Sequence, residues 1–468
     1  MFDAVLRRFQ VDYILPKAER LGPIGTTKEL YDKYLKIAWP ATLQGLMLQF
    51  MTAIDLAMVG ALGAEALASV GIMGQPEMVM LVFVRALSVA ITAIIARRKG
   101  EGDDAGMNSV LKQAIMMTML FYIPLLIICF FSIEHILRFT GAEDSYIGTA
   151  VDYSQFIVIA LIFQSFSQIV GAALIGYGNT KVIFKANVIG NIANTVMNFF
   201  LIYGIGFFPK LGVMGAGIST MLSSALIAAL LFRVINKRDQ TLTLQHETPW
   251  KFNREVVHTV YHVGGSSLGE QFFERFGMYT YTMIVASLGA TALAAHYVCM
   301  NLMDIFYYFA MGLGFAGASH TGQSLGHKRP DMALAYGRIG SRIGWIVGIV
   351  SALIFILLGT YIVQLYTRDV AVVAMSGSMM GIMALAAFPQ ALQLVYSGVL
   401  KGAGDTYYIM KYSLISIAII RPIVTYTLCI TIGWGLAGAW LALLNDQSIR
   451  LLCSYARFVK GQWQHKIV

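Results

Sequence analysis

The sequence VGALGAEALA at residues 59–68 returns as VASLGATALA at residues 285–294, 226 residues later. A second pair, LIGYGNT from Leu174 and LKGAGDT from Leu400, has the same separation. In a third pair, GVMGA and GLAGA, the separation is three residues shorter. A register that is kept over so long a distance indicates two homologous halves.

The composition places both halves in a membrane. Charged residues make up 13% of the 468 positions and hydrophobic residues 57%, with a mean hydropathy of +0.67. A soluble domain carries about 25% charged residues. A membrane helix needs about 20 apolar residues, so the chain can hold about a dozen spans and no sizeable soluble domain. The apolar segments lie at 37–61, 66–96, 113–137, 149–175, 182–207, 211–232, 255–287, 291–325, 335–365, 371–399, 407–432 and 434–456.

We therefore expect an all-α integral membrane protein with twelve transmembrane helices in two six-helix lobes. Because six is even, both halves enter the membrane from the same side, and a pseudo-two-fold axis along the membrane normal relates them. In residues 2–9, apolar side chains recur at helical spacing opposite Arg7 and Arg8, which favours a short surface helix, with a frayed tail as the alternative. The expected parts are an N-terminal segment 1–36, lobes at 37–235 and 254–457, a linker 236–253, and a tail 458–468.

The distribution of basic residues sets the orientation. Of the 34 lysine and arginine residues, 27 lie in the two tails and in every second loop, and three lie on the other side. The positive-inside rule then puts both termini in the cytoplasm and the protein in the inner membrane. Topology explains the net charge of +9, so we expect a bilayer and a small-molecule substrate as partners, no nucleic acid, and a monomer. The remaining basic residues lie inside predicted spans: Arg85, Arg275, Arg421 and Arg450.

Five motifs resemble those of the multidrug and toxic compound extrusion family, and the resemblance covers residues 36–457. It implies an antiporter that takes up protons or sodium while it expels organic, often cationic, compounds, with no cofactor. The wider superfamily also contains flippases for polysaccharide and lipid precursors. The motifs are AIDLAMVGALGAEALASVG from Ala53, ALSVAITAIIARRKGEGD from Ala86, VASLGATALAAH from Val285, GQSLGHKR from Gly322 and SGVLKGAGDT from Ser397.

Asp55 is the first candidate for ion coupling. It lies eight residues before Gly63, roughly 12 Å from the outer end of the first span. A charge at that depth costs roughly 2.5–3.5 kcal/mol and requires a partner or a function. The resemblance implies that Asp55 binds the coupling ion together with Asn194 and Asn198, where DinF-like and archaeal members have an asparagine and an aspartate. The alternative is an aspartate that only hydrogen-bonds neighbouring helices.

A second candidate site lies in the seventh predicted span, where Glu270, Glu274 and Arg275 follow a GGSS turn. Glu274 lies roughly 21 Å from the outer end of its span, and the resemblance implies the coupling role of a glutamate in NorM-like members. Glu270 and Glu274 lie one turn apart and would repel each other if both were ionised, so the pair is suited to hold one proton. An ion pair with Arg275 is the structural alternative.

The sequence departs from the NorM-like pattern elsewhere. The tenth-span aspartate of that pattern falls at Gln390, so Glu274 would have to work with Glu270 or with Asp304. Arg85 replaces a small residue and requires a carboxylate such as Glu77 or Glu270, or an anionic substrate. We therefore take Arg85, Gln164, Asp304 and Gln390 as candidates for lining the substrate cavity.

No catalytic or metal-binding machinery is recognisable. GLGFAG from Gly312 has the spacing of a dinucleotide motif, but it lies in an apolar helix in which small residues favour close packing. The sequence has no phosphate-binding lysine motif and no HExxH, so we expect no enzyme. An ion-coupled exporter is the main prediction. The alternatives are a lipid-precursor flippase and a membrane sensor that transports nothing.

Overall fold

The computed structural model describes residues 9–206 and 208–466, and within them it contains helices and no strands. The all-helical fold predicted from the sequence is thus confirmed for the described residues. The surface helix predicted at residues 2–9 lies almost entirely outside them. The first part of the chain contains α2 (Val11–Ile14), α3 (Thr27–Gly60), α4 (Ala64–Gly71), α5 (Gly74–Glu101), α6 (Asp104–Met117), η2 (Thr118–Tyr122), α7 (Ile123–Phe131), α8 (Ile133–Phe139), α9 (Ile147–Tyr177), α10 (Thr180–Tyr203) and α11 (Gly212–Ile235).

The second part repeats this pattern of long helices, one of which is interrupted by π-helical turns. The turn η3 directly follows α16 and precedes α17, and η4 directly follows α17. The elements are α12 (Arg254–Ala286), α13 (Ala290–Gly326), α14 (Pro330–Tyr366), α15 (Val370–Gly402), α16 (Thr406–Ser413), η3 (Leu414–Ile420), α17 (Arg421–Tyr426), η4 (Thr427–Thr431) and α18 (Gly435–Lys460).

Nine of the helical segments among the described residues are long and apolar enough to cross a bilayer. The chain is therefore a multi-pass membrane protein. The helices α10, α12 and α18 are not among the nine. These three helices carry polar side chains within their length, Asn194 and Asn198, Glu270 and Glu274, and Arg450 respectively, which lower their hydropathy.

The chain divides into two compact units, which we describe separately. The second unit comprises Leu43–Ile95 and Asp103–Tyr261, and the first unit comprises the rest of the chain, including Ala96–Gly102. The helices α3, α5 and α12 each contribute residues to both units. The lobe boundaries expected from the sequence stay a prediction.

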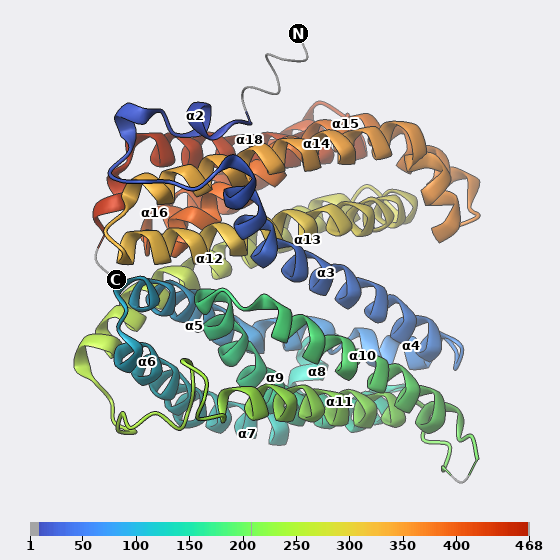
Figure 1. Ribbon diagram of the computed structural model, residues 1–468. Coiled ribbons are helices and arrows are strands. Elements are labelled where there is room, and N and C mark those ends of the chain that lie inside the picture. Colours follow the sequence, from blue (N-terminus) through green and yellow to red (C-terminus); the bar gives the residue numbers. More distant parts are fainter. Residues whose placement is uncertain (1–8, 207, 467–468) are drawn as a thin grey trace. The chain divides into compact units, whose positions relative to one another are not determined.

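In the second unit, α11 packs against both α9 and α10 (Figure 1). The segment 236–253 is attached to α6 by side chains that bind its backbone. The Lys112 ammonium donates hydrogen bonds to the carbonyl oxygens of His246 (2.7 Å) and Thr248 (2.8 Å). The Asn108 amide oxygen accepts from the Thr243 backbone N–H at 2.7 Å. The linker predicted at 236–253 is therefore held against the start of the third predicted span.

In the first unit, α13, α14 and α15 pack side by side, and α15 also packs on α18 (Figure 1). Glycines allow the close approach of α13 and α15. A Cβ atom on Gly398 would overlap the backbone carbonyl of Gly314, and a Cβ on Gly402 would overlap that of Ala318. The GLGFAG sequence is thus a packing surface, as predicted, and the glycines of the SGVLKGAGDT motif face it.

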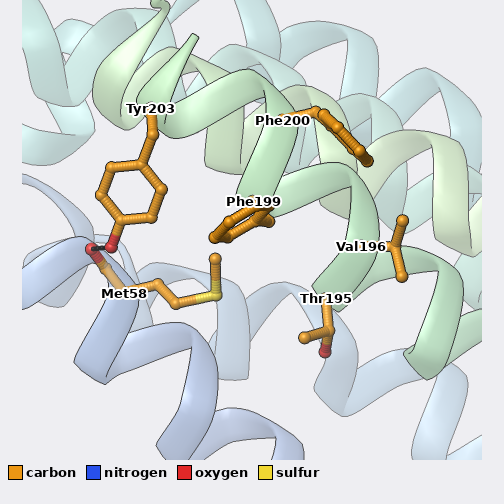
Figure 2. Close-up of a pocket in the computed structure, with 6 residues that line it drawn as sticks. All are labelled: Met58, Thr195, Val196, Phe199, Phe200 and Tyr203. Atoms are coloured by element: carbon orange, nitrogen blue, oxygen red, sulfur yellow. Dashed lines mark hydrogen bonds between the residues drawn. The ribbon is translucent and has the colours of Figure 1, made fainter. Parts of the chain in front are cut away.

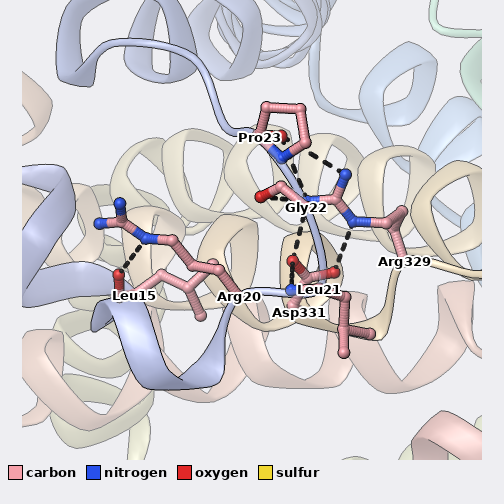
Figure 3. Close-up of polar contacts among 7 residues, drawn as sticks. All are labelled: Leu15, Arg20, Leu21, Gly22, Pro23, Arg329 and Asp331. Carbon is pink, nitrogen blue, oxygen red and sulfur yellow. Dashed lines mark hydrogen bonds and ion pairs between the residues drawn. The ribbon is translucent and has the colours of Figure 1, made fainter.

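The N-terminal segment binds the start of α14 (Figure 3). The Leu21 backbone N–H donates to an Asp331 carboxylate oxygen at 3.0 Å. The Arg329 guanidinium holds the same carboxylate at 2.8 Å and reaches the carbonyl oxygen of Pro23 at 3.3 Å. These hydrogen bonds raise the pKa of Arg329 above its ordinary value. The described part of this segment is therefore docked on α14, whereas the frayed tail considered for residues 2–9 falls almost entirely outside the described residues.

Two expectations about helix limits are corrected. The first span, predicted from residue 37, belongs to a helix that begins at Thr27. Leu30 and Tyr34 are buried on one face of its first turns, while the lysines there lower the local hydropathy. The GGSS sequence is not a turn, because residues 264–267 lie inside α12, where the helix supplies the hydrogen bonds of their backbone.

The glycine contact between α13 and α15 gives a test of this packing. We expect Gly398→Val to lower the free energy of unfolding by about 2 kcal/mol, because the added side chain has to push two helices apart. Thermal unfolding of the purified protein in detergent measures the effect. Gly381→Ala on the same helix is the control. A Cβ there meets no atom within 4 Å, so its unfolding temperature should be unchanged or higher. Equal losses in both variants would contradict the packing.

Candidate functional site

A carboxylate and two amides meet inside the second unit. The Asn198 amide on α10 donates a hydrogen bond to Asp55 Oδ1 on α3 at 2.7 Å. With its amide nitrogen turned toward the carboxylate, Asn194 donates to both Asp55 oxygens at 3.0 Å and accepts from the Thr220 backbone N–H at 3.2 Å. The structure thus brings together the three residues that the sequence analysis grouped as one site.

Helical spacing explains why both asparagines point to the same carboxylate. Residues four apart lie on one face of a helix. That face of α10 is buried, since Asn194 is 7% exposed and Asn198 is 1% exposed. The Asn198 amide oxygen has no hydrogen-bond partner among the described residues. The cluster therefore offers carboxylate and amide oxygens, which are ligands for a proton or a hard cation, around a single negative charge.

A second group of charges lies close to this cluster. Tyr153 on α9 is within electrostatic reach of both Asp55 and Glu77. Glu77 is in turn within reach of Arg85, both on α5. Of the partners that the sequence left open for Arg85, Glu77 is therefore within its electrostatic reach. Gln164, another predicted cavity residue, lies in the same unit, and its amide donates to the Ser224 hydroxyl at 3.4 Å.

An apolar cavity of about 560 Å³ lies next to the Asp55 cluster. Figure 2 shows Met58, one helical turn after Asp55, facing the side chains of α10. The Tyr203 hydroxyl, which belongs to the lining, donates to the Met58 carbonyl oxygen at 2.9 Å. The wall is aromatic and aliphatic, which suits the apolar part of an organic molecule. Its lining residues are Met58, Thr195, Val196, Phe199, Phe200 and Tyr203.

In the first unit, Glu270 forms an ion pair that the sequence analysis did not anticipate. Its Oε1 lies 2.9 Å from the Lys401 ammonium, and its side chain is 5% exposed. Lys401 had been assigned to a cytoplasmic loop, whereas it lies in the last turn of α15. Glu270 thus pairs with a cation from another helix, while its neighbour on its own helix is a second acid, Glu274. A proton shared by the two glutamates stays a prediction.

The other predicted residues of this unit lie around Tyr307. This tyrosine on α13 is within electrostatic reach of Glu274, Asp304 and Arg450. Glu274, Asp304 and Arg450 are thus each within electrostatic reach of one tyrosine, and a joint role of Glu274 and Asp304 stays a prediction. Gln390 is half-buried in α15.

The sequence analysis missed Asp446 on α18. Its side chain is 0% exposed, and its Oδ1 accepts a hydrogen bond from the Ser416 hydroxyl at 2.5 Å. Its Oδ2 lies 3.9 Å from the Arg421 guanidinium. The signal was present, because this aspartate lies in the middle of the last predicted span. Ser416 belongs to the π-helical turn η3, a feature often found at functional positions.

The described residues contain no group of three histidine, cysteine, aspartate or glutamate side chains that could hold a metal ion. His320 is stacked against Tyr336, with ring centroids 4.1 Å apart, and its Nε2 lies 3.2 Å from the Lys33 carbonyl oxygen. His296 packs among the rings of Tyr281 and Trp440. Both histidines have the packed environment of core residues.

The sequence can now be compared with known families. The MatE family model matches residues 40–200 and again residues 267–427, which together make up more than half of the chain. The chain belongs to the MatE family. The second match begins at residue 267, 227 residues after residue 40, which is close to the separation of the sequence repeats. Proteins of this family are transporters and not enzymes, as the sequence predicted.

Several relatives and solved structures extend along almost the whole MatE chain. A probable multidrug resistance protein NorM from Thermotoga maritima is 25% identical, over 97% of this chain and 96% of that protein. The multidrug resistance protein NorM of Vibrio cholerae is also 25% identical, over 89% of this chain and 93% of that protein. A mutant of the Vibrio cholerae MATE transporter VcmN matches the fold with a TM-score of 0.87 at 17% identity, over 94% and 99%. A transporter of the MOP superfamily from Pyrococcus furiosus matches the fold with a TM-score of 0.85 at 18% identity, over 94% of this chain and 97% of that chain.

The Glu270–Lys401 pair of this MatE protein can be tested by a double-mutant cycle. Lys401→Met should lower the free energy of unfolding by about 2 kcal/mol, less than for a fully buried pair because Lys401 is partly exposed. Adding Glu270→Gln should restore most of the loss, since no uncompensated buried charge remains. Thermal unfolding in detergent measures both. Additive losses in the double variant would show that the two side chains do not interact.

Proposed function

We propose that this MATE transporter is a proton- or sodium-coupled antiporter that exports small organic cations or amphiphilic compounds. The observation that carries the proposal is the contact of Asp55 with Asn194 and Asn198, in which one carboxylate is bound by neutral amides. A carboxylate in such surroundings is the only charged member of its cluster. Binding of any cation there removes a negative charge from the interior of the unit.

Antiport follows from competition for this one charge. A coupling ion and an organic cation cannot both neutralise Asp55, so binding of one weakens binding of the other by the same factor. If binding of a cation at Asp55 favours opening toward one side of the membrane, and its release favours opening toward the other side, then cation exchange is linked to the conformational change. We propose that Asp55, Asn194 and Asn198 form the coupling site. Glu274, with Glu270, stays a candidate for a second site.

The substrate class rests on the apolar cavity beside the cluster. Met58 and Phe199 line this cavity, and Asp55 lies one turn from Met58. Such a wall selects for apolar surface and shape and forms few directional hydrogen bonds, so it suits chemically varied compounds. The relatives from Thermotoga maritima and Vibrio cholerae carry the name multidrug resistance protein. We extend that substrate class to this chain, with Arg85, Gln164, Asp304 and Gln390 as further candidates for contact with substrate.

The proposed architecture is twelve spans in two six-helix lobes, at 37–235 and 254–457, with both termini in the cytoplasm. The nine apolar helices together with α10, α12 and α18 would supply these spans. Alternating access by movement of the two lobes needs only one exchanging carboxylate, because a single change of charge can bias both openings.

A lipid-precursor flippase is the alternative within the superfamily. That function would need a basic cavity, and Arg85 was the residue that favoured it. The presence of Glu77 within electrostatic reach of Arg85 gives this arginine a counter-charge inside the same unit. We therefore favour export of organic cations. Accumulation of a lipid-linked precursor, and of no soluble dye, in the assay below would reverse this preference.

Substitution of Asp55 tests the coupling site. We expect Asp55→Asn to lose at least nine-tenths of dye export from proteoliposomes driven by a proton or sodium gradient, because the variant cannot change its charge. The two gradients are imposed separately, which identifies the coupling ion. Asp152→Asn, the same substitution at an exposed position of α9, is the control and should transport normally. Full export by Asp55→Asn would reject the site, and no export by the native chain under either gradient would favour a sensor.

The charge moved in each cycle is a second test. Exchange of one monovalent organic cation for one proton at Asp55 moves no net charge, so the membrane potential, about 2.3 kcal/mol per charge per 100 mV, should contribute nothing. We expect a pH difference to drive accumulation of a monovalent dye and a potassium diffusion potential at equal pH to drive none. A response to the potential would show that a second cation is exchanged and would implicate Glu274.

A further inference from the structure

The environment of Arg421 is unusual for a membrane helix. Its guanidinium is buried in the first unit, with the residue 3% exposed. It donates to the Met278 sulfur at 3.1 Å and lies 4.3 Å from the ring centroid of Tyr281, both on α12. Its third neighbour is the Asp446 carboxylate on α18, at 3.9 Å. The cation is thus held by a sulfur atom, an aromatic face and an acid.

Asp446 is as deeply buried as any acid in the described chain. It accepts from the Ser416 hydroxyl, and its Oδ2 has no hydrogen-bond donor among the described residues. Arg450, one turn further along α18, is also buried and within electrostatic reach of Asp446. Glu270, Glu274, Tyr412 and Tyr307 are also within electrostatic reach of Arg450. Arg421 and Arg450 are thus two cations of the chain near Asp446, and Arg421 is the one within ion-pair distance.

The internal repeat relates this group to the Asp55 cluster. With the separation of 226 residues, Asp55 corresponds to Tyr281, and Asn194 corresponds to Ile420, which directly precedes Arg421. The helices correspond in the same way. In the second unit, α3 meets α10 through Asp55 and Asn198. In the first unit, their counterparts α12 and α17 meet through Tyr281 and Arg421.

The two corresponding helix contacts carry opposite charge. The N-terminal half has a carboxylate surrounded by neutral amides, and the C-terminal half has a guanidinium fixed to the chain. We propose that Arg421 is a built-in cation, which fills the C-terminal counterpart of the Asp55 site and neutralises Asp446 so that this acid takes no cation from solution. This inference rests on the proposed function of Asp55 as the exchanging site.

The difference has a physical consequence for the transport cycle. A side chain cannot leave its site as a free ion can, so the C-terminal site stays in its cation-bound state while the N-terminal site alternates. An uncompensated charge in a low-dielectric interior costs free energy, and a guanidinium that is covalently attached to the chain compensates the Asp446 charge throughout the cycle. Glu270 and Lys401 follow the same scheme in the same unit. One half therefore switches, and the other keeps a constant charge at the equivalent position.

Removal of the Arg421 side chain should create a site for a soluble guanidinium ion. We expect Arg421→Ala, in the full-length chain in detergent at neutral pH, to unfold about 4 °C lower than the native chain. Millimolar methylguanidinium should recover at least half of this loss and should saturate, because it replaces the missing group beside Asp446. Choline at the same concentration should not, since it carries no N–H donors.

Two further variants are compared with this one. Arg421→Ala combined with Asp446→Asn should be more stable than Arg421→Ala alone and should not respond to methylguanidinium. Arg342→Ala removes a half-buried arginine that stacks on the Tyr13 ring at 6.0 Å, and it should show no saturable recovery. The proposal is overturned if Arg421→Ala responds no more than Arg342→Ala, or if the double variant responds equally.

The result is decisive even if Arg421→Ala cannot be purified. In that case the double variant decides, because recovery of a folded protein by Asp446→Asn shows that the unpaired acid caused the failure. Failure of the double variant as well would contradict the proposal. None of these measurements involves transport. They can therefore fail while Asp55→Asn still abolishes export, and they can succeed if Asp55 proves unimportant.

Discussion

A charged side chain at the depth of a bilayer loses the hydration that water gives it, and it stays charged only if the protein supplies a partner. Much of the arrangement of this chain can be understood as a response to that constraint. In the second unit, the amides of Asn194 and Asn198 bind Asp55 without neutralising it. In the first unit, Lys401 neutralises Glu270, and Arg421 lies beside Asp446. Amides leave a charge free to be exchanged, whereas cations of the chain do not.

The helices that carry these groups need close neighbours. The more polar helices α10, α12 and α18 cannot present all of their faces to lipid, so they pack on more apolar helices, as α10 does on α11 and α18 on α15. Glycines allow some helices of the first unit to approach closely. A Cβ on Gly100 of α5 would overlap the backbone of Gln323 on α13, and these two residues lie in two of the family motifs. Several glycines in these motifs thus serve helix packing and have no direct part in ion chemistry.

Gene duplication gives two equivalent positions, and this chain has used them differently. The N-terminal half keeps an acid at the contact of its first and fifth spans. The C-terminal half has an aromatic ring and a guanidinium at the corresponding contact. If the two halves both exchanged cations, each cycle would move more charge and would respond to the membrane potential. In the proposed cycle, a fixed cation in one half would keep the exchange at one charge. This view connects the proposed stoichiometry to particular side chains.

Periodicity, composition and repeats determined the helical membrane fold, the approximate span positions, the two halves and the family, because hydropathy and spacing are properties of the chain alone. The sequence also determined that Asn194 and Asn198 share a helical face, and it predicted that Asp55 lies within a span. Only the tertiary structure decided which distant groups meet. Lys401 could not be paired with Glu270 from the sequence, because the two residues lie more than a hundred positions apart and hydropathy assigned that lysine to a loop. Asp446 and Arg421 likewise come together through the packing of α17 on α18, and the one-dimensional pattern contains no information on which neighbour a buried charge will find.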